Sequence, residues 1–347
     1  MKHNLAPVRA PALPAQPSGG GFGRGAEPPS EWVRLLDLGK VSPLRSQALY
    51  HGLAESMEEG SPDTIVLCRP AAPYFCVGYH RAPRAELDLA WCRRNGYPVF
   101  QRRIGGGTVF LDPDQLFYQC IFHRSRAPFD VASIYRRFLS PPVRVLQALG
   151  LPATLEGVNE IEVGGRRIAG TGGGQIGEAV VVVGNLLFDF PADVMARAWR
   201  VPSSEFRRLA EDGLRRHLAT LRGELSGHPP EAEIRRRLVE AYEATLGRPI
   251  IPGGLTPAEE VAVRGEERRL TRLDETDGSR GPHRAGLKVT RRVWVHEWRG
   301  HVGERPARVT ARVADGRIEE MVMSGAALDR KEAERRIRSA LVPEKGR

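Results

Sequence analysis

Short apolar runs and helix-spaced apolar positions alternate along the chain after residue 41. Runs rich in β-branched and aromatic residues predict strands, and apolar residues spaced by three and four positions predict helices. The strands expected on this basis span residues 64–68, 74–79, 116–122, 160–163, 167–169 and 179–190. The helices expected are one that Ser42 caps, one over 87–94, two that Pro141 and Pro142 separate, and one that ends at Gly247. This interleaving predicts an α+β fold, in which a mixed β-sheet carries flanking helices on one face.

The two ends of the chain differ from this central region. Residues 1–30 are rich in Pro, Gly and Ala, so we expect a disordered N-terminal segment, followed by one large domain over residues 31–250. Residues 251–286 are polar and Gly-rich with little periodicity, and we expect a linker or extension there. Residues 287–347 contain alternating strands, an Asp315-Gly316 turn and an Asp329–Glu332 capping box, which predict a small β-rich accessory domain.

The formal net charge is +10, and nearly all basic residues are arginine, with lysine only at positions 2, 40, 288, 331 and 345. Because these charges are spread along the chain and acidic residues are nearly as many, we expect no nucleic-acid partner. The basic surface could equally attract a nucleotide or an acidic partner protein. No apolar run approaches the roughly 20 residues that span a bilayer, and no signal-peptide hydrophobic region begins the chain, which predicts a cytoplasmic protein without a membrane partner. The four cysteines have no C-x-x-C spacing and are expected to be reduced structural thiols.

The candidate chemistry centres on the stretch from Gln101 to Asp112, which contains three consecutive glycines between two strand-like runs. Without Cβ atoms, such a loop can turn sharply and lay its backbone against a bound group. The adjacent Arg102 and Arg103 have the fork geometry that suits a phosphate or carboxylate. The alternative is a glycine-rich hairpin with two solvated arginines, so this stretch is weighed with two others.

Two further segments have the same character. One begins at Asn159 and runs through two short strands to Gly170, and the other begins at Gly184-Asn185 within an apolar strand. With R-R-x-G-G-G-x-V-x-x-D, N-E-I-x-V-x-G-R-R-I-x-G and G-N-L-L in this order, the chain resembles the lipoate–protein ligase family. The resemblance covers roughly residues 44–247. It implies a catalytic domain similar to class II aminoacyl-tRNA synthetase and biotin–protein ligase cores, followed by a small accessory domain.

The resemblance also implies a two-step reaction. Lipoate and ATP give lipoyl-AMP and pyrophosphate, and a lysine of a lipoyl-domain carrier protein then displaces AMP; ATP, Mg²⁺ and lipoate are the expected ligands. Carried over, Arg102 contacts the phosphate as an exposed arginine that adds little to stability, and Asn159 helps to hold the adenylate or the metal, whose own site stays unassigned. The remaining residues expected to bind ATP or the acyl group are Gly105, Gly106, Gly107, Thr108, Val109, Phe110, Gly170, Gly184 and Asn185.

The sequence departs from the family pattern at two positions. The second motif normally carries a lysine where this chain has Arg167, and no lysine elsewhere in the catalytic region can replace it. Either Arg167 supplies the charge and acts as the catalytic residue, or the chain has become a non-catalytic binder of lipoyl or adenylate groups, because guanidinium and ammonium groups are not interchangeable at a close-packed site. The second departure is Leu111, where many relatives carry His.

A second enzymatic alternative within the same fold is octanoyl or lipoyl transfer through a cysteine thioester. Transferases of this superfamily carry that cysteine near the second motif, whereas no cysteine follows Cys120 in this chain. Cys120 itself lies in an apolar strand, where an inert buried thiol is expected. The sequence therefore favours the ATP-dependent ligase.

Overall fold

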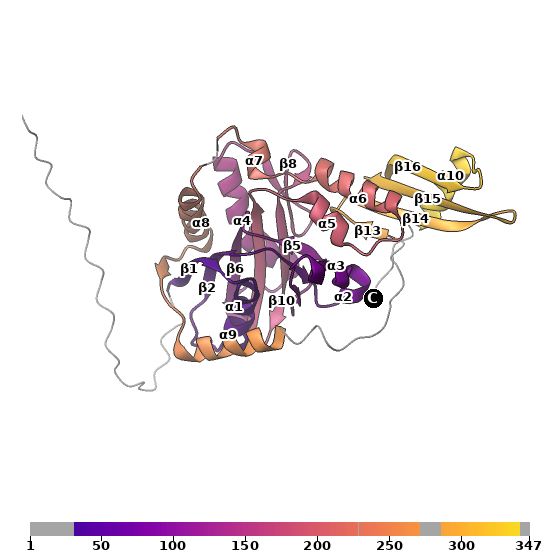
Figure 1. Cartoon of the computed structure of the whole chain (residues 1–347). Coiled ribbons are helices and arrows are strands. Elements are labelled where there is room, and N and C mark those ends of the chain that lie inside the picture. The colour runs from indigo at the N-terminus through magenta and orange to yellow at the C-terminus, as the bar shows by residue number, and fades with distance from the viewer. Residues whose placement is uncertain (1–30, 228, 271–285, 341–347) are drawn as a thin grey trace, which may run out of the picture.

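The computed structural model describes residues 31–227, 229–270 and 286–340, so the disorder expected for residues 1–30 lies outside the described part. A six-stranded mixed sheet forms the centre of the molecule (Figure 1). Its strands, in spatial order, are β10 (Ala169–Ile176), β11 (Ala179–Leu187), β6 (Gln115–His123), β2 (Thr64–Pro70), β1 (Val33–Val41) and β12 (Ile250–Pro252). The three strands β2, β1 and β12 run parallel, while β6, β11 and β10 pair antiparallel. The expected mixed-sheet α+β fold is thus confirmed.

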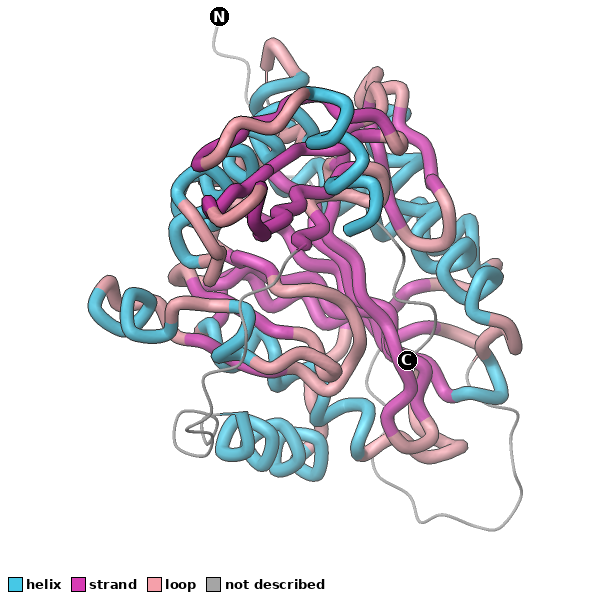
Figure 2. Tube along the Cα trace, turned by 90° about the vertical axis from the view of Figure 1, so that its right-hand side faces the viewer, coloured by secondary structure: helices cyan, strands magenta, loops and turns pink. Residues whose placement is uncertain are grey.

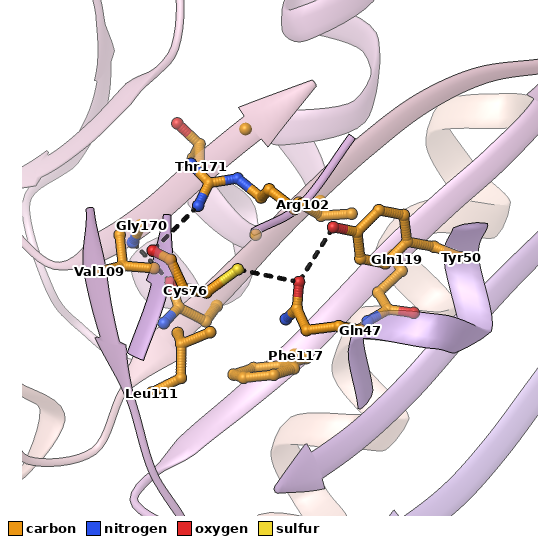
Figure 3. A pocket seen from close by; sticks show the side chains of 14 residues that line it. Gln47, Tyr50, Cys76, Arg102, Val109, Leu111, Phe117, Gln119, Gly170 and Thr171 are labelled. Carbon is orange, nitrogen blue, oxygen red and sulfur yellow. Dashed lines mark hydrogen bonds between the residues drawn. The ribbon is translucent and has the colours of Figure 1, made fainter. Parts of the chain in front are cut away.

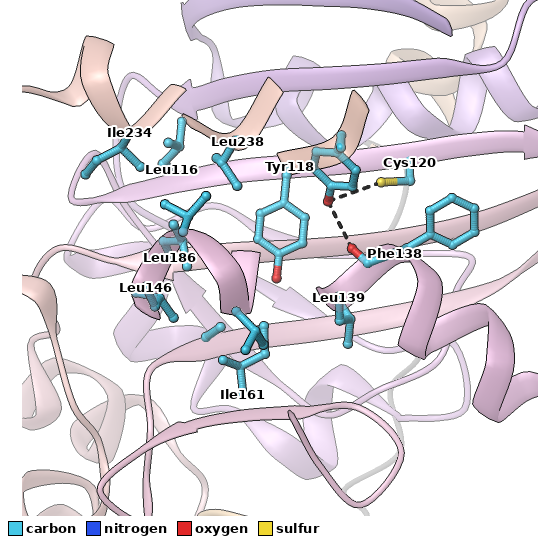
Figure 4. Close-up of a cluster of buried hydrophobic side chains, with 14 of the residues drawn as sticks. Leu116, Tyr118, Cys120, Phe138, Leu139, Leu146, Ile161, Leu186, Ile234 and Leu238 are labelled. Carbon is cyan, nitrogen blue, oxygen red and sulfur yellow. Dashed lines mark hydrogen bonds between the residues drawn. The ribbon is translucent and has the colours of Figure 1, made fainter. Parts of the chain in front are cut away.

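Helices cover both faces of this sheet, not one. Along β6, Tyr118 and Cys120 pack into one core with α4 (Val131–Ala148) and α8 (Glu231–Leu246), as Figure 4 shows. Phe117 and Ile121 point the other way, into a second core. That core also contains α1 (Pro43–Glu55), which Ser42 caps as predicted, and α9 (Pro257–Leu270). The expectation of one covered face was wrong because β6 is apolar on both faces, as strands buried on both sides are.

The two prolines expected to divide a helix lie inside α4. Without a proline N–H, the carbonyl of Phe138 loses the helical donor at Pro142. The buried Tyr242 hydroxyl donates to that carbonyl at 3.0 Å, from α8. A tertiary hydrogen bond thus replaces the missing helical one, while Leu139 and Leu146 bury on either side of the prolines. These contacts explain why the helix continues.

Part of the stretch expected to be a linker or extension is regular structure. Helix α9 lies along α1, and Gly52 permits the approach, since a Cβ there would lie 2.6 Å from the Val263 backbone. A buried ion pair between Arg34 and Glu259 (2.5 Å) fastens the start of α9 to β1. The first half of this stretch is therefore packed on the large domain, and residues 271–285 lie outside the described part.

Two small sheets and several short helices complete this region. The sheets are β4 (Val99–Gln101), β3 (Tyr74–Val77) and β5 (Val109–Leu111), and β7 (Ala153–Glu156), β8 (Glu160–Val163) and β9 (Arg166–Arg167). The helices are α2 (Pro83–Glu86), α3 (Leu89–Arg94), α5 (Ala192–Ala198), α6 (Ser204–His217) and α7 (Leu221–Glu224), with a 3-10 turn over Arg124–Arg126. The sequence pattern did not predict α5, α6 or α7. Within the described ranges, no helix is both long and apolar enough to cross a bilayer.

The C-terminal residues form an antiparallel sheet of β13 (Gly286–Lys288), β14 (Val293–Val302), β15 (Arg305–Ala314) and β16 (Arg317–Gly325), followed by α10 (Arg330–Ala340). The predicted turn is confirmed, with positive φ at Asp315 (48°) and Gly316 (73°). This sheet packs on α6, and its buried Leu287 shares a core with Phe206. Figure 2 views the molecule from the side on which this sheet projects in Figure 1. The C-terminal module therefore contacts the large domain directly.

Candidate active site

The glycine loop lies between β4 and β5 and is tied to its own arginine. Arg102 is 5% exposed, so the expectation of an exposed side chain was wrong. Its guanidinium donates to the carbonyls of Gly105 (3.0 and 3.1 Å), Gly107 (2.9 Å) and Cys76 (3.3 Å). These bonds fix the loop conformation, and the phosphate contact expected of Arg102 stays a prediction.

Any residue other than glycine at position 106 would strain this loop. Its φ is +109°, and a Cβ at this position would lie 2.4 Å from Nη2 of Arg102. Gly78 faces it, since a Cβ there would lie 2.0 Å from the Gly106 carbonyl oxygen. The glycines thus serve the close backbone approach that the sequence predicted.

The second and third motifs meet where β10 pairs with β11. Gly170 and Asn185 are paired in register, and the Gly170 N–H donates to Oδ1 of Asn185 at 2.7 Å. The Asn185 amide in turn donates to Gln115. The hydroxyl of Thr171, on β10, donates to the carbonyl of Asn159, at the start of the second motif. Asn185 therefore orients the strand that carries Gly170 and Thr171.

Residues of the three motifs line two adjoining cavities. The inner pocket, of about 60 Å³, is lined by Val183 and by three residues labelled in Figure 3, Val109, Leu111 and Phe117. The Tyr50 hydroxyl and the Cys76 thiol, which also line the pocket, both donate to Oε1 of Gln47, at 3.0 and 3.4 Å (Figure 3). Leu111, one of the two departures from the expected motif pattern, adds to the apolar wall. The inner pocket is thus a narrow apolar slot.

The outer cavity, of about 410 Å³, opens beside it and shares Val109, Gly170, Thr171 and Asn185 with the inner pocket. Its wall includes the cationic side chains of Arg81 and Arg167 and two carboxylates, Glu86 and Glu160. The Thr108 hydroxyl donates to Glu86 at 3.0 Å. A ligand with an elongated apolar part in the slot and a polar part in the cavity would have the junction of its two parts beside the four shared residues.

All but one of the site residues expected from the sequence line one or both of the two cavities. The outer cavity is lined by Gly106, Gly107, Thr108, Phe110, Asn159 and Arg167, the inner pocket by Arg102 and Gly184, and both by Val109, Gly170 and Asn185. Gly105 lines neither and acts through its carbonyl, which accepts from Arg102. Gln47 and Tyr50, on α1, escaped the sequence reasoning because helix periodicity gives no sign that they face a pocket.

Arg167 is held by two partners at the cavity wall. It pairs with Glu160, which is 4% exposed, and its Nη1 donates to the carbonyl of Val289 at 3.2 Å. Lys288 also lines this cavity. A lysine therefore does reach the site, although the chain has no lysine between Val41 and Leu287.

Among residues 31–227, 229–270 and 286–340, no three His, Cys, Asp or Glu side chains gather as a metal-binding group. The side-chain oxygens of Asn159 and Glu86 line the cavity and could serve Mg²⁺, whereas the carboxylate of Glu160 is already paired with Arg167 and the Arg291 N–H. Mg²⁺ in nucleotide sites commonly takes one or two protein ligands and completes its shell with phosphates and water. The cavity fits that mode of binding and no dedicated protein cage.

The catalytic-domain model of the lipoyl protein ligase A/B family matches residues 42–243, more than half of the chain. The chain belongs to this family. Among its relatives, octanoyltransferase LipM of Symbiobacterium thermophilum is 26% identical over an alignment of 251 residues that covers 65% of this chain and 91% of that protein. Lipoate-protein ligase LplJ of Bacillus subtilis is 26% identical over 167 residues, covering 48% of this chain and 50% of that protein.

Solved structures of family members share the fold. The bipartite lipoate protein ligase of Thermoplasma acidophilum, described with its E2 lipoyl domain, matches with a TM-score of 0.64 and 21% identity, covering 72% of this chain and 99% of that chain. A lipoate-protein ligase A bound with ATP matches with a TM-score of 0.58 and 22% identity, covering 69% and 95%. The relatives thus include both ligases and transferases.

Proposed function

We propose that the protein attaches lipoate, or a closely related acyl group, to a lysine of a lipoyl carrier domain at the expense of ATP. A lipoate carboxylate oxygen attacks the α-phosphorus of ATP and pyrophosphate leaves. The carrier lysine amine then attacks the acyl carbonyl carbon, AMP leaves, and the amine proton passes to solvent. Relatives with this fold have been described with ATP and with lipoic acid bound, which supports these two ligands.

The observation that carries this proposal is the junction of the apolar inner pocket with the basic outer cavity. The slot between Leu111 and Val183 suits the hydrocarbon part of an acyl chain. Burial of each methylene there would stabilise the bound complex by about 0.8 kcal/mol. The carboxyl end then lies near Gly170 and Thr171, where the two cavities meet. An adenylate in the outer cavity would meet loop N–H groups and cationic side chains, the donors that stabilise charge developing on phosphate.

The second candidate is octanoyl transfer, which the similarity to LipM favours. It needs a thiolate to carry the acyl group. All four cysteines are buried, and of these only Cys76 lines either cavity. Burial raises the pKa of the Cys76 thiol, which opposes formation of the thiolate. Cys76→Ala should therefore leave acyl transfer to the carrier domain largely intact if the protein is a ligase, and abolish it if Cys76 is the nucleophile.

The direct test offers two acyl donors to one acceptor. A lipoyl-domain acceptor is incubated with the protein and either lipoate, ATP and Mg²⁺ or an octanoyl carrier-protein thioester without ATP, and its mass is measured. We expect a lipoyl mass increase in the first mixture only. An increase in the second mixture only would establish the transferase, and binding of lipoyl-AMP without modification in either would establish a non-catalytic homologue.

A further inference from the structure

The outer cavity receives a lysine from the C-terminal sheet. Lys288 ends β13 and lines the cavity together with Arg167 and Asn159. Its neighbours Leu287 and Val289 are 6% and 3% exposed and pack in the core shared with α6. Because side chains alternate along a strand, this packing directs Lys288 to the other face, where it remains exposed to solvent.

The segment that carries Lys288 is fastened to the second motif. The Val289 carbonyl accepts from Arg167, and the Val289 N–H donates to the carbonyl of Val293 at 2.8 Å. Two residues further on, the Arg291 N–H donates to both carboxylate oxygens of Glu160 at 3.0 Å. Arg167 and Glu160 therefore hold the end of β13 against the cavity.

This fastening occupies the guanidinium of Arg167. Its charge is paired with the buried Glu160, and one of its N–H groups is directed to the Val289 carbonyl. A planar guanidinium fixed on both sides cannot also present a compact cation to a substrate oxygen. The position at which the family pattern has a lysine thus has a structural use in this chain.

We propose that Lys288 supplies, from the C-terminal domain, the ammonium group that the family pattern provides from the second motif, and that it binds the phosphate and acyl carbonyl oxygens of the acyl-adenylate. The inference rests on the proposed function. Arg167 is then a positioning residue that holds β13, and Lys288 is the group that meets the substrate.

The charges around Lys288 favour an anionic ligand. Arg167, Arg291 and Arg81 act on it as like charges, against Glu160 as the opposing one. Partial desolvation of the amine beside the cavity wall, and next the charge of Arg167, lower the pKa of Lys288. A bound phosphate would favour the charged amine, so the affinity for an adenylate should fall when the pH is raised enough to deprotonate Lys288 in the free protein.

The test measures binding of a hydrolysis-resistant analogue, a lipoyl sulfamoyl-adenosine, by isothermal titration calorimetry on the full chain. Lys288→Met should weaken binding about ten- to a hundredfold, the loss typical of a hydrogen bond to a charged group. Lys288→Arg should retain more of the affinity because it keeps the charge. Lys331→Met, at an exposed position on α10, is the matched control and should bind as the parent does.

A pH series separates substrate contact from a general structural effect. Between pH of about 7 and about 10, the affinity of the parent should fall, whereas that of Lys288→Met should change little, since the titrating amine is gone. Thermal unfolding of Lys288→Met should match the parent. Equal affinity and equal pH dependence for Lys288→Met and the parent would overturn the inference. If the parent then still lipoylates the acceptor with ATP, the proposed function stands without it.

Discussion

Removal of the Arg102 side chain should destabilise the empty protein as well as impair acyl-adenylate formation. In Arg102→Ala, the carbonyls of Cys76, Gly105 and Gly107 lose their donor. Hydrogen bonds from a charged group contribute about 1.5–3 kcal/mol each, but water can reach the exposed Gly107 and the half-buried Gly105 and replace part of the loss. Only the Cys76 carbonyl lies among fully buried residues. We therefore expect the free energy of unfolding to fall by about 2–4 kcal/mol.

Urea unfolding and thermal melts without any substrate measure this effect. A loss of that size corresponds to a decrease in melting temperature of roughly 5–15 °C for a domain of this size. Arg330→Ala, whose parent side chain is 77% exposed, is the control and should change stability by less than about 0.5 kcal/mol. A melting temperature within about 1 °C of the parent, with adenylate formation abolished, would refute the loop-holding role and leave a phosphate contact as the function of Arg102.

Three further predictions concern the buried side chains of Asp112 and Tyr242 and the glycine at position 106. Burial raises the pKa of Asp112 to about 6, so the free energy of unfolding of the parent should fall as the pH rises from about 4 to above 6. Asp112→Asn should therefore be about 2 kcal/mol more stable than the parent at pH of about 8, but not at pH of about 4. Urea unfolding at both pH values measures this difference. Tyr242→Phe should cost about 1–2 kcal/mol in the same assay, because the Phe138 carbonyl then lacks a donor. Gly106→Ala should cost about 1–3 kcal/mol and slow pyrophosphate release, whereas Gly60→Ala, where a Cβ meets no atom within 4 Å, should do neither.

Local signals in the sequence identified much of the fold. Ser42 before a proline correctly marked the start of α1, and the Asp315-Gly316 pair marked the hairpin between β15 and β16. Such signals depend on only a few neighbouring residues. The motif residues were grouped by the resemblance of the three motifs to the lipoate–protein ligase family, and the structure places all of them but Gly105 at two adjoining cavities.

Features that depend on contacts between distant segments could not be predicted. Helix α9 carries charge on most of its surface, and the packing that holds it depends on Gly52, far away in the sequence. The burial of Arg102 depends on carbonyls that the loop turns toward it. Lys288 reaches the cavity only because the C-terminal sheet packs on α6, and no periodicity near residue 288 indicates that contact.

Lipoate-dependent exchange of labelled pyrophosphate into ATP distinguishes the ligase from the transferase, since it reports acyl-adenylate formation without a carrier protein. We expect exchange with the parent that requires both lipoate and the protein, persists in Cys76→Ala, and decreases in Lys288→Met. If the folded parent shows no exchange and nevertheless transfers an octanoyl group from a thioester, the proposed ligase activity is contradicted.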